Sequence, residues 1–263
     1  MTEKKKEEPK QEIAPVEVQL PAERTTSHRG IKKLDREDQM IPRIKVMQGL
    51  SPEVQEGLAK YGDLVNSLTK ENYGKEVVIV PIDWSTSRIY WKERKEGGGI
   101  VCRAFDGKKG STYGDCSNCE HKNWKADESG ENIPSACTKI FNILGAIAKP
   151  DKQPELIAVS FLKTSFKFGK EWINVMNYKN VDLFNFSYKL YTDSVSNDMG
   201  TYNVLRYKDL NSATPEALYK MCAGLYERFT TNAPIVDDIT EDDTPGKGSK
   251  AESKKQGQKE FDF

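Results

Sequence analysis

Short apolar runs and alternating apolar and polar positions fill the chain between residues 41 and 234, and they predict a strand-dominated domain. The clearest examples are the β-branched run Lys75–Ile82 and the alternation of rings with polar residues over Phe184–Leu190. The other expected extended segments are 41–47, 87–94, 100–105, 141–148, 156–162 and 202–207. A short turn is expected before 87–94.

Helices are expected at the edges of this strand pattern. Ser51 as N-cap and Pro52 at the first helical position predict a helix that runs to about Tyr61. Residues 164–177 have an amphipathic pattern, and a similar cap followed by proline begins a final helix over 212–231. The predicted class is β-rich α+β, an OB-like antiparallel barrel with flanking helices and an insert between strands.

Composition separates this domain from two arms. Of the chain's 25 aromatic residues, 23 lie in 41–234, and 30% of all residues are charged. Segments without rings cannot bury enough apolar surface to fold. We therefore expect a disordered N-terminal arm over 1–40, one folded domain over 41–234, and a disordered acidic tail over 235–263.

The net charge of zero hides an uneven distribution. The arm carries nine basic and nine acidic groups, the domain 26 and 23, and the tail five and eight. A basic domain with an acidic tail can contact a polyanion while the tail competes for the same surface. The alternative is that both arms only keep the protein soluble.

Four cysteines within a short stretch carry the candidate metal chemistry: Cys102, Cys116, Cys119 and Cys137. The CxxC pair Cys116 and Cys119 can turn two thiolates toward one tetrahedral cation, and the outer two complete the shell. The surrounding segment is rich in Gly, Ser, Asn and Asp, so it has little apolar material to fix its own shape. The expected cofactor is a Zn²⁺ ion that orders an insert over 102–137.

Other readings of these cysteines remain. The charged N-terminus lacks an apolar signal segment, which favours a reducing compartment and disfavours disulfides. Cys116 follows a loop-like segment rather than a strand, unlike a redox CxxC. His121 is close enough in sequence to replace one thiol, which would leave Cys102 a core residue. Cys222 falls on the apolar face of the last helix and is expected to be a core thiol.

Rings and cations alternate along the predicted strands. Single-stranded nucleic acid offers bare base faces and a phosphate chain, so rings that stack beside cations suit it. The alternative is that the rings pack in the core, to which about half of the domain's rings, Trp84 among the candidates, are assigned. The expected contact residues are Arg88, Tyr90, Trp91, Lys92, Arg94, Arg103, Phe105, Lys163, Lys167, Phe168, Lys170, Trp172, Tyr188, Lys189, Tyr191 and Arg206.

The chain ends on Phe261, Asp262 and Phe263, after a tail that otherwise carries no ring. Exposed phenylalanines at the tip of an acidic linker suggest a short docking peptide for a partner protein. The sequence has no Gly-rich phosphate loop, GxSxG elbow or HExxH motif, and only two histidines. We therefore expect a protein that is not an enzyme; no Asp/Glu/His cluster suits a nuclease.

The cysteine-containing stretch from Ile100 to Cys137, followed by Phe161–Lys167 and the phenylalanine-ended tail, resembles the zinc-containing single-stranded DNA-binding proteins of bacteriophage replication. The resemblance implies an OB fold that holds the strand in a basic aromatic groove. It also implies a tail that recruits polymerase, helicase or recombination proteins. Two features depart from the family: four cysteines where a mixed His and Cys shell is known, and five lysines within the tail.

Together these observations predict a single-stranded DNA-binding protein that acts in phage DNA replication or recombination. Its expected partners are single-stranded DNA and replication or recombination proteins, with no membrane contact. Its expected location is the cytoplasm, that of the bacterial host if it is phage-encoded. The alternative is a zinc-ribbon transcription or virion-assembly factor that acts through protein contacts.

Overall fold

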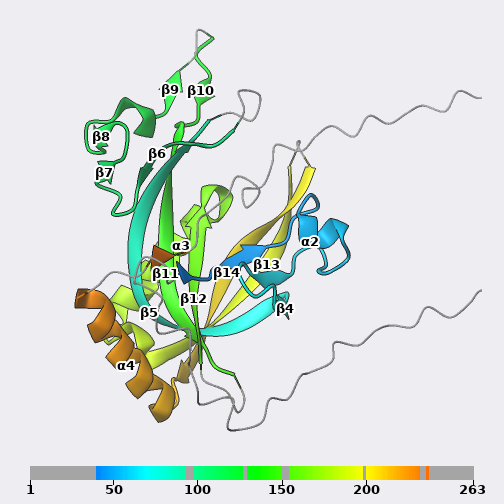
Figure 1. Cartoon of the computed structure of the whole chain (residues 1–263), viewed down its shortest axis with the longest axis vertical. Coiled ribbons are helices and arrows are strands. Elements are labelled where there is room, and N and C mark those ends of the chain that lie inside the picture. Colours follow the sequence, from blue (N-terminus) through cyan, green and yellow to red (C-terminus); the bar gives the residue numbers. More distant parts are fainter. Residues whose placement is uncertain are drawn as a thin grey trace, which may run out of the picture. The chain divides into compact units, whose positions relative to one another are not determined.

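A computed structural model describes residues 40–92, 98–126, 129–149, 154–197, 200–231 and 235–236 (Figure 1). These residues form a β-rich structure with few helices and mostly antiparallel strand pairs, which confirms that part of the predicted class. The predicted arms lie outside the described residues, apart from Met40 and the pair 235–236. None of the helices within the described ranges is both long and apolar enough to cross a membrane.

The largest sheet in the described residues has six strands, and every pairing in it is antiparallel. Its order is β12-β11-β5-β13-β14, and β6 pairs with the far end of β5. The long curved ribbon of β5 in Figure 1 therefore holds both halves of the sheet. The bounds are β5 Glu76–Trp91, β6 Ile100–Ala104, β11 Cys137–Ile147, β12 Glu155–Leu162, β13 Phe186–Asn197 and β14 Gly200–Ala213.

β5 corrects one expectation from the sequence. The segments 75–82 and 87–94 were predicted as two strands joined by a turn, but Glu76–Trp91 is one strand of 16 residues. The intervening residues 83–86 stay extended because each of them pairs with a residue of β11. A continuous ladder on a neighbouring strand thus overrides the local turn signal.

Smaller strands surround the sheet. β2 lies between its two edge strands: the Ala158 backbone N–H of β12 donates to the Pro42 carbonyl at 2.8 Å, just before β2. On the other side, the Gln48 side chain donates to the Asn203 carbonyl of β14 at 2.9 Å and accepts from its N–H at 3.0 Å. The bounds are β1 Met40–Ile41, β2 Ile44–Val46, β3 Leu64–Asn66, β4 Asn72–Gly74, β7 Lys109–Gly110, β8 Gly114–Asp115, β9 Lys125–Ala126, β10 Asn132–Ile133 and β15 Ile235–Val236.

The two longer helices lie where the sequence predicts them: α3 covers Phe166–Tyr178 and α4 covers Glu216–Thr231. The first one is shorter than predicted, because α2 covers only Pro52–Gln55. Gly57 has a φ of 76°, and this left-handed conformation ends a helix. Short 3₁₀ helices are η4 Glu120–Lys122, η5 Lys163–Ser165 and η6 Leu183–Asn185.

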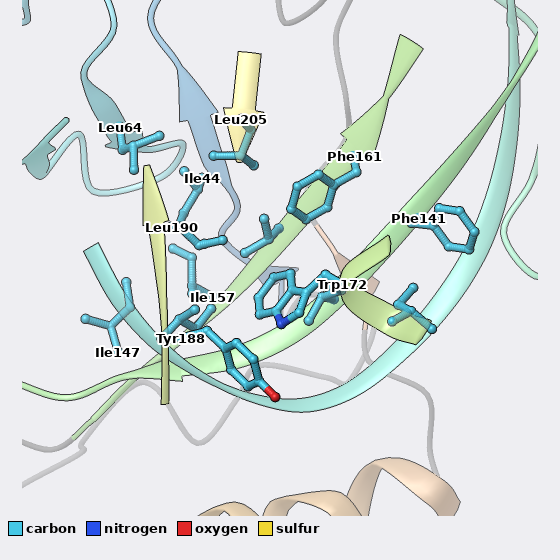
Figure 2. Close-up of a cluster of buried hydrophobic side chains, with 14 of the residues drawn as sticks. Ile44, Leu64, Phe141, Ile147, Ile157, Phe161, Trp172, Tyr188, Leu190 and Leu205 are labelled. Carbon is cyan, nitrogen blue, oxygen red and sulfur yellow. The ribbon is translucent and has the colours of Figure 1, made fainter. Parts of the chain in front are cut away.

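The main core lies between the sheet, β2 and α3 (Figure 2). Trp172 of α3 is fully buried, with its ring centroid 5.9 Å from Phe161 and 5.3 Å from Tyr188. Tyr188 is 1% exposed. Both Trp172 and Tyr188 were predicted to contact nucleic acid, and their burial corrects that prediction, because neither ring has a face free for a base.

A second apolar cluster joins α4 to the sheet. Cys222 and Leu218 of α4 pack with Val80 and Ile82 of β5 and with Phe184. Cys222 is fully buried, which confirms its prediction as a core thiol.

Two helical glycines test how closely α3 is packed. A Cβ at Gly169 of α3 would lie 2.5 Å from the Phe161 Cβ, whereas a Cβ at Gly224 of α4 would meet nothing within 4 Å. Overpacking costs about 1–3 kcal/mol, and alanine gains about 1 kcal/mol over glycine in a helix. At such short approach the overpacking term dominates. We predict that urea unfolding will show Gly169→Ala to be destabilised and Gly224→Ala to be stabilised. Equal effects of the two changes would contradict the packing.

Candidate metal centre and nucleic-acid interface

The cysteine insert grows out of the sheet between β5 and β11. Tyr90 of β5 pairs with Cys137 of β11 on one side and with Cys102 of β6 on the other. Directly paired residues lie on the same face of a sheet, so Cys102 and Cys137 flank Tyr90 on one face. Cys116 and Cys119 follow β8 in the insert loop. The sheet register thus positions two of the thiols and the loop brings the other two.

All four predicted ligands line one cavity of about 10 Å³. This volume is close to that of a single water-sized sphere and far below that of an organic-cofactor pocket. All five cysteines of the chain are free thiols, and Cys222 lies apart in the α4 cluster. The other lining residues are Arg88, Tyr90, Ala104, Gly110, Tyr113, Gly114, His121, Lys122.

The β7–β8 hairpin can pack against the cavity because Gly110 has no side chain. A Cβ at Gly110 would lie 2.7 Å from the Cys102 Sγ and 3.9 Å from the Cys116 Sγ. Any larger residue would push the Cys102 sulfur away. The Cys116 backbone N–H also donates to the Lys108 carbonyl at 2.8 Å, which holds the loop against the hairpin.

The surroundings of the cavity shift the pKa values of its thiols in different directions. Burial alone would raise the pKa of Cys102, but hydrogen bonds from the backbone N–H groups of Thr112 and Tyr113 hold it below its usual value. Burial raises the pKa of Cys116 and Cys137, and the positive charge of Arg88 opposes this shift in both. Arg88 also hydrogen bonds the Cys137 side chain. A thiolate is thus favoured at Cys102, whereas at Cys116 and Cys137 burial outweighs the charge of Arg88 and favours the neutral thiol.

As it stands, no three Cys, His, Asp or Glu side chains in the described ranges are arranged to hold a metal ion. The four sulfurs share a cavity wall without forming a closed shell. His121 lines the same cavity, but its ring lies 4.9 Å from that of Tyr90 and 4.4 Å from that of Tyr113. Both His121 and the four thiols therefore remain candidate ligands.

Several predicted contact residues form ring–cation sites. The Lys163 Nζ lies 5.5 Å from the Trp91 ring centroid, and the Arg103 Cζ lies 4.3 Å from that of Phe105. In α3, the ring of Phe168 has Lys167 at 4.9 Å, and Arg206 of β14 at 4.6 Å. Phe105 is 69% exposed. We call these three groups the ring–cation sites.

Two of these sites border the face of β5, β11 and β12 that points away from the main core, which we call the outer face. Phe141 and Ile143 of β11 face the core, so the intervening Asn142 points to the outer face. Asn142 donates to the Ser87 hydroxyl at 2.9 Å and accepts from Ser160 at 2.8 Å. The residues of this face are Ser87, Ile89, Trp91, Arg103, Ile140, Asn142, Ser160 and Leu162. Ile89 and Ile140 at its centre are buried, and Trp91, Arg103 and Leu162 are partly exposed.

The remaining predicted contacts are scattered. Arg88 and Tyr90 line the cysteine cavity instead of the outer face. Lys189 of β13 forms an ion pair with Glu76 at 2.8 Å, and Tyr191 pairs in register with Arg206. Lys92 and Lys170 are exposed. Arg94, Phe261, Asp262 and Phe263 lie outside the described residues.

Sequence reasoning missed two exposed tryptophans. Trp124 of the insert is 65% exposed beside Lys125, and Trp84 of β5, which was assigned to packing, is 43% exposed. The charged neighbour of Trp124 is the same signal that marked the strand residues. Trp124 could therefore have been included among the predicted nucleic-acid contacts. Trp84 follows the charged Asp83, so the same signal was present there. The hollow that it lines could not be predicted, because a helix distant in the sequence forms the other side.

Comparison with known proteins identifies the family. A family model described as Pam3 phage gp34-like protein matches residues 10–233. The chain belongs to this family. It is therefore a phage-type protein, which confirms this part of the resemblance. No curated protein and no solved structure matches the chain.

Thiol reactivity provides a test of the cavity's separation from the α4 core. Burial raises the pKa of Cys222 to about 11, so at pH 8 it is almost wholly the unreactive neutral thiol. In folded, metal-free protein we predict that a disulfide reagent modifies Cys222 last, and rapidly only after unfolding. The Cys222→Ala variant should lose that slow phase alone. Five thiols reacting at one rate would contradict the assignment.

Proposed function

We propose that this phage protein is a non-enzymatic single-stranded DNA-binding protein that acts in DNA replication or recombination. The observation that carries the proposal is the set of three ring–cation sites, two of which border the outer face. Each stacked base contributes about 1–3 kcal/mol, whereas an exposed ion pair contributes about 0–1 kcal/mol. Rings such as Phe105 would therefore dominate affinity, and the cations beside them would contact phosphates.

The strand order supports an OB-like arrangement. In chain order, β5, β11, β12, β13 and β14 would be its five strands: the first pairs with the second and the fourth, and α3 lies between the third and fourth. OB folds bind oligonucleotides on the face of strands 2 and 3 and with the loops that follow strands 1 and 4. Here those elements are β11 and β12, the cysteine insert, and the ends of β13 and β14 at Asn197 and Gly200.

The donor set of the insert fits a structural Zn²⁺ ion. Four thiols on one small cavity are a common structural zinc shell, and the hydrogen bonds to Cys102 favour its thiolate. Four thiolates around a divalent cation leave two negative charges, which Arg88 and Lys122 at the cavity wall would offset. Cys102, Cys116, Cys119 and Cys137 would hold the ion, and its binding would order the loop beside the outer face.

The tail completes the proposal. Its acidic residues and terminal Phe261, Asp262 and Phe263 suit a basic, apolar pocket on a replication or recombination partner. This part rests on sequence alone.

Fluorescence titration with oligo-dT at two salt concentrations tests the function. We expect tight binding at low salt that weakens as salt rises. Lysine and arginine side chains that contact phosphates displace the counterions held by the DNA, and added salt opposes this release. Duplex DNA should bind much less. If no single strand binds at low salt, the proposal fails. The exposed Trp124 and Ile133 of the insert would then favour the alternative, a transcription or assembly factor that acts through protein contacts.

Paired variants test the interface. Phe105→Ala should weaken oligo-dT binding roughly 5- to 150-fold, the loss of one stacked base. Tyr178→Ala, which removes a ring that is 91% exposed at the end of α3, should change it little. Lys167→Gln should reduce the slope of log affinity against log salt by about 0.7, while Lys220→Gln on α4 leaves it unchanged. Equal effects within either pair would argue against this surface.

Metal analysis tests the zinc proposal separately. Purified protein should contain one zinc per chain, and Cys116→Ser should lose it and become sensitive to protease between residues 103 and 136. The control, Cys222→Ala, should keep the metal. Unchanged zinc in Cys116→Ser would overturn the ligand assignment. Retention of zinc in Cys102→Ser together with its loss in His121→Ala would favour the mixed shell.

A further inference from the structure

A hollow of about 540 Å³ lies between β5 and the C-terminal end of α3. Trp84 of β5 forms one wall, the buried Ile173 and Met176 form apolar lining, and the loop after α3 closes it. Its volume falls within the range of small-molecule sites. Trp84 and Val181 are large apolar residues that remain 43% and 50% exposed there, which is typical of a ligand site. Neither residue belongs to the outer face.

Unused hydrogen-bonding groups gather on the wall opposite the ring. The side-chain amides of Asn177 and Asn180 line the hollow, and neither makes a hydrogen bond within the described part of the chain. Asn174 uses its NH₂ on the Lys170 carbonyl at 2.7 Å, which leaves its oxygen to face a ligand. An amide group both donates and accepts, so this wall complements a planar polar heterocycle.

The charges of the hollow exclude an anion. Among the described residues that line it, none is a lysine, arginine or histidine. Asp182 lies on the rim, fixed by the Tyr219 hydroxyl of α4, which donates to its Oδ2 at 2.9 Å. The carbonyl end of α3 adds further partial negative charge. A phosphate would be repelled, whereas a neutral ligand with N–H donors would be favoured.

We infer that this hollow binds one nucleobase that carries an exocyclic amino group, adenine or cytosine, stacked on Trp84. Asparagine amides pair with adenine edges, and an aspartate accepts from the amino group of cytosine. Thymine lacks such an amino donor toward Asp182 and binds more weakly. The inference rests on the proposed function for the source of this base. The base would belong to the bound DNA strand, whose phosphates are held elsewhere on the protein.

Nucleosides separate this site from the strand-binding surface, because they lack phosphate. Full-length protein is titrated with adenosine, cytidine and thymidine, and binding is followed by saturation-transfer NMR. Adenosine and cytidine are expected to bind more tightly than thymidine. Trp84→Leu should weaken adenosine roughly 5- to 150-fold. Asn177→Ala, an exposed change that spares the core, should also weaken it, while Lys220→Gln on α4 leaves it unchanged.

An oligonucleotide arm identifies the source of the base. A single adenine within oligo-dT should tighten binding to the wild type but not to Trp84→Leu. Absence of nucleoside binding, or binding unaffected by both Trp84→Leu and Asn177→Ala, overturns the inference even if oligo-dT binds normally. If nucleosides bind but no oligonucleotide does, the hollow is a binding site for free nucleosides and the proposed function fails.

Discussion

The register of β5 is the constraint on which the rest of the structure depends. Its first residues pair with β13, its middle with β11, and its last with β6, so one strand fixes both halves of the sheet and the start of the insert. Side chains alternate between faces with a period of two, so a shift by one residue would exchange the two faces. Cys137 would then no longer lie beside Tyr90, and the cysteine cavity would not form.

The same strand separates the two candidate activities. Tyr90 lines the cysteine cavity, whereas the next residue, Trp91, belongs to the outer face with Lys163 above it. A metal-ordered insert can therefore stiffen the end of the sheet without occupying the surface proposed for the strand. The Trp84 hollow lies nearer the middle of β5, against α3. Asparagine side chains line it, and no cationic side chain of the described residues does. Phosphate and base contacts would thus be divided among different parts of one sheet.

Much of the strand and helix pattern could be predicted from the sequence, and so could the shared location of the four cysteines. Local patterns failed where a distant partner decides the outcome. Residues 83–86 were expected to form a turn, but β11 holds them extended. Trp172 and Tyr188 have charged neighbours in sequence, yet α3 and the sheet bury both rings. Trp84 also has a charged neighbour, Asp83, but its hollow could not be predicted because the end of α3 completes it.

The central claim is that unpaired bases stack on the rings of the three ring–cation sites. Photocrosslinking tests it most directly: full-length protein is bound to oligo-deoxyuridine carrying a photoreactive halogen on its bases, irradiated, and the adducts are located by mass spectrometry. The account predicts adducts on Trp91, Phe105 or Phe168 that disappear when unlabelled single strand competes. Adducts confined to α4, or none under conditions where the strand is bound, would contradict it.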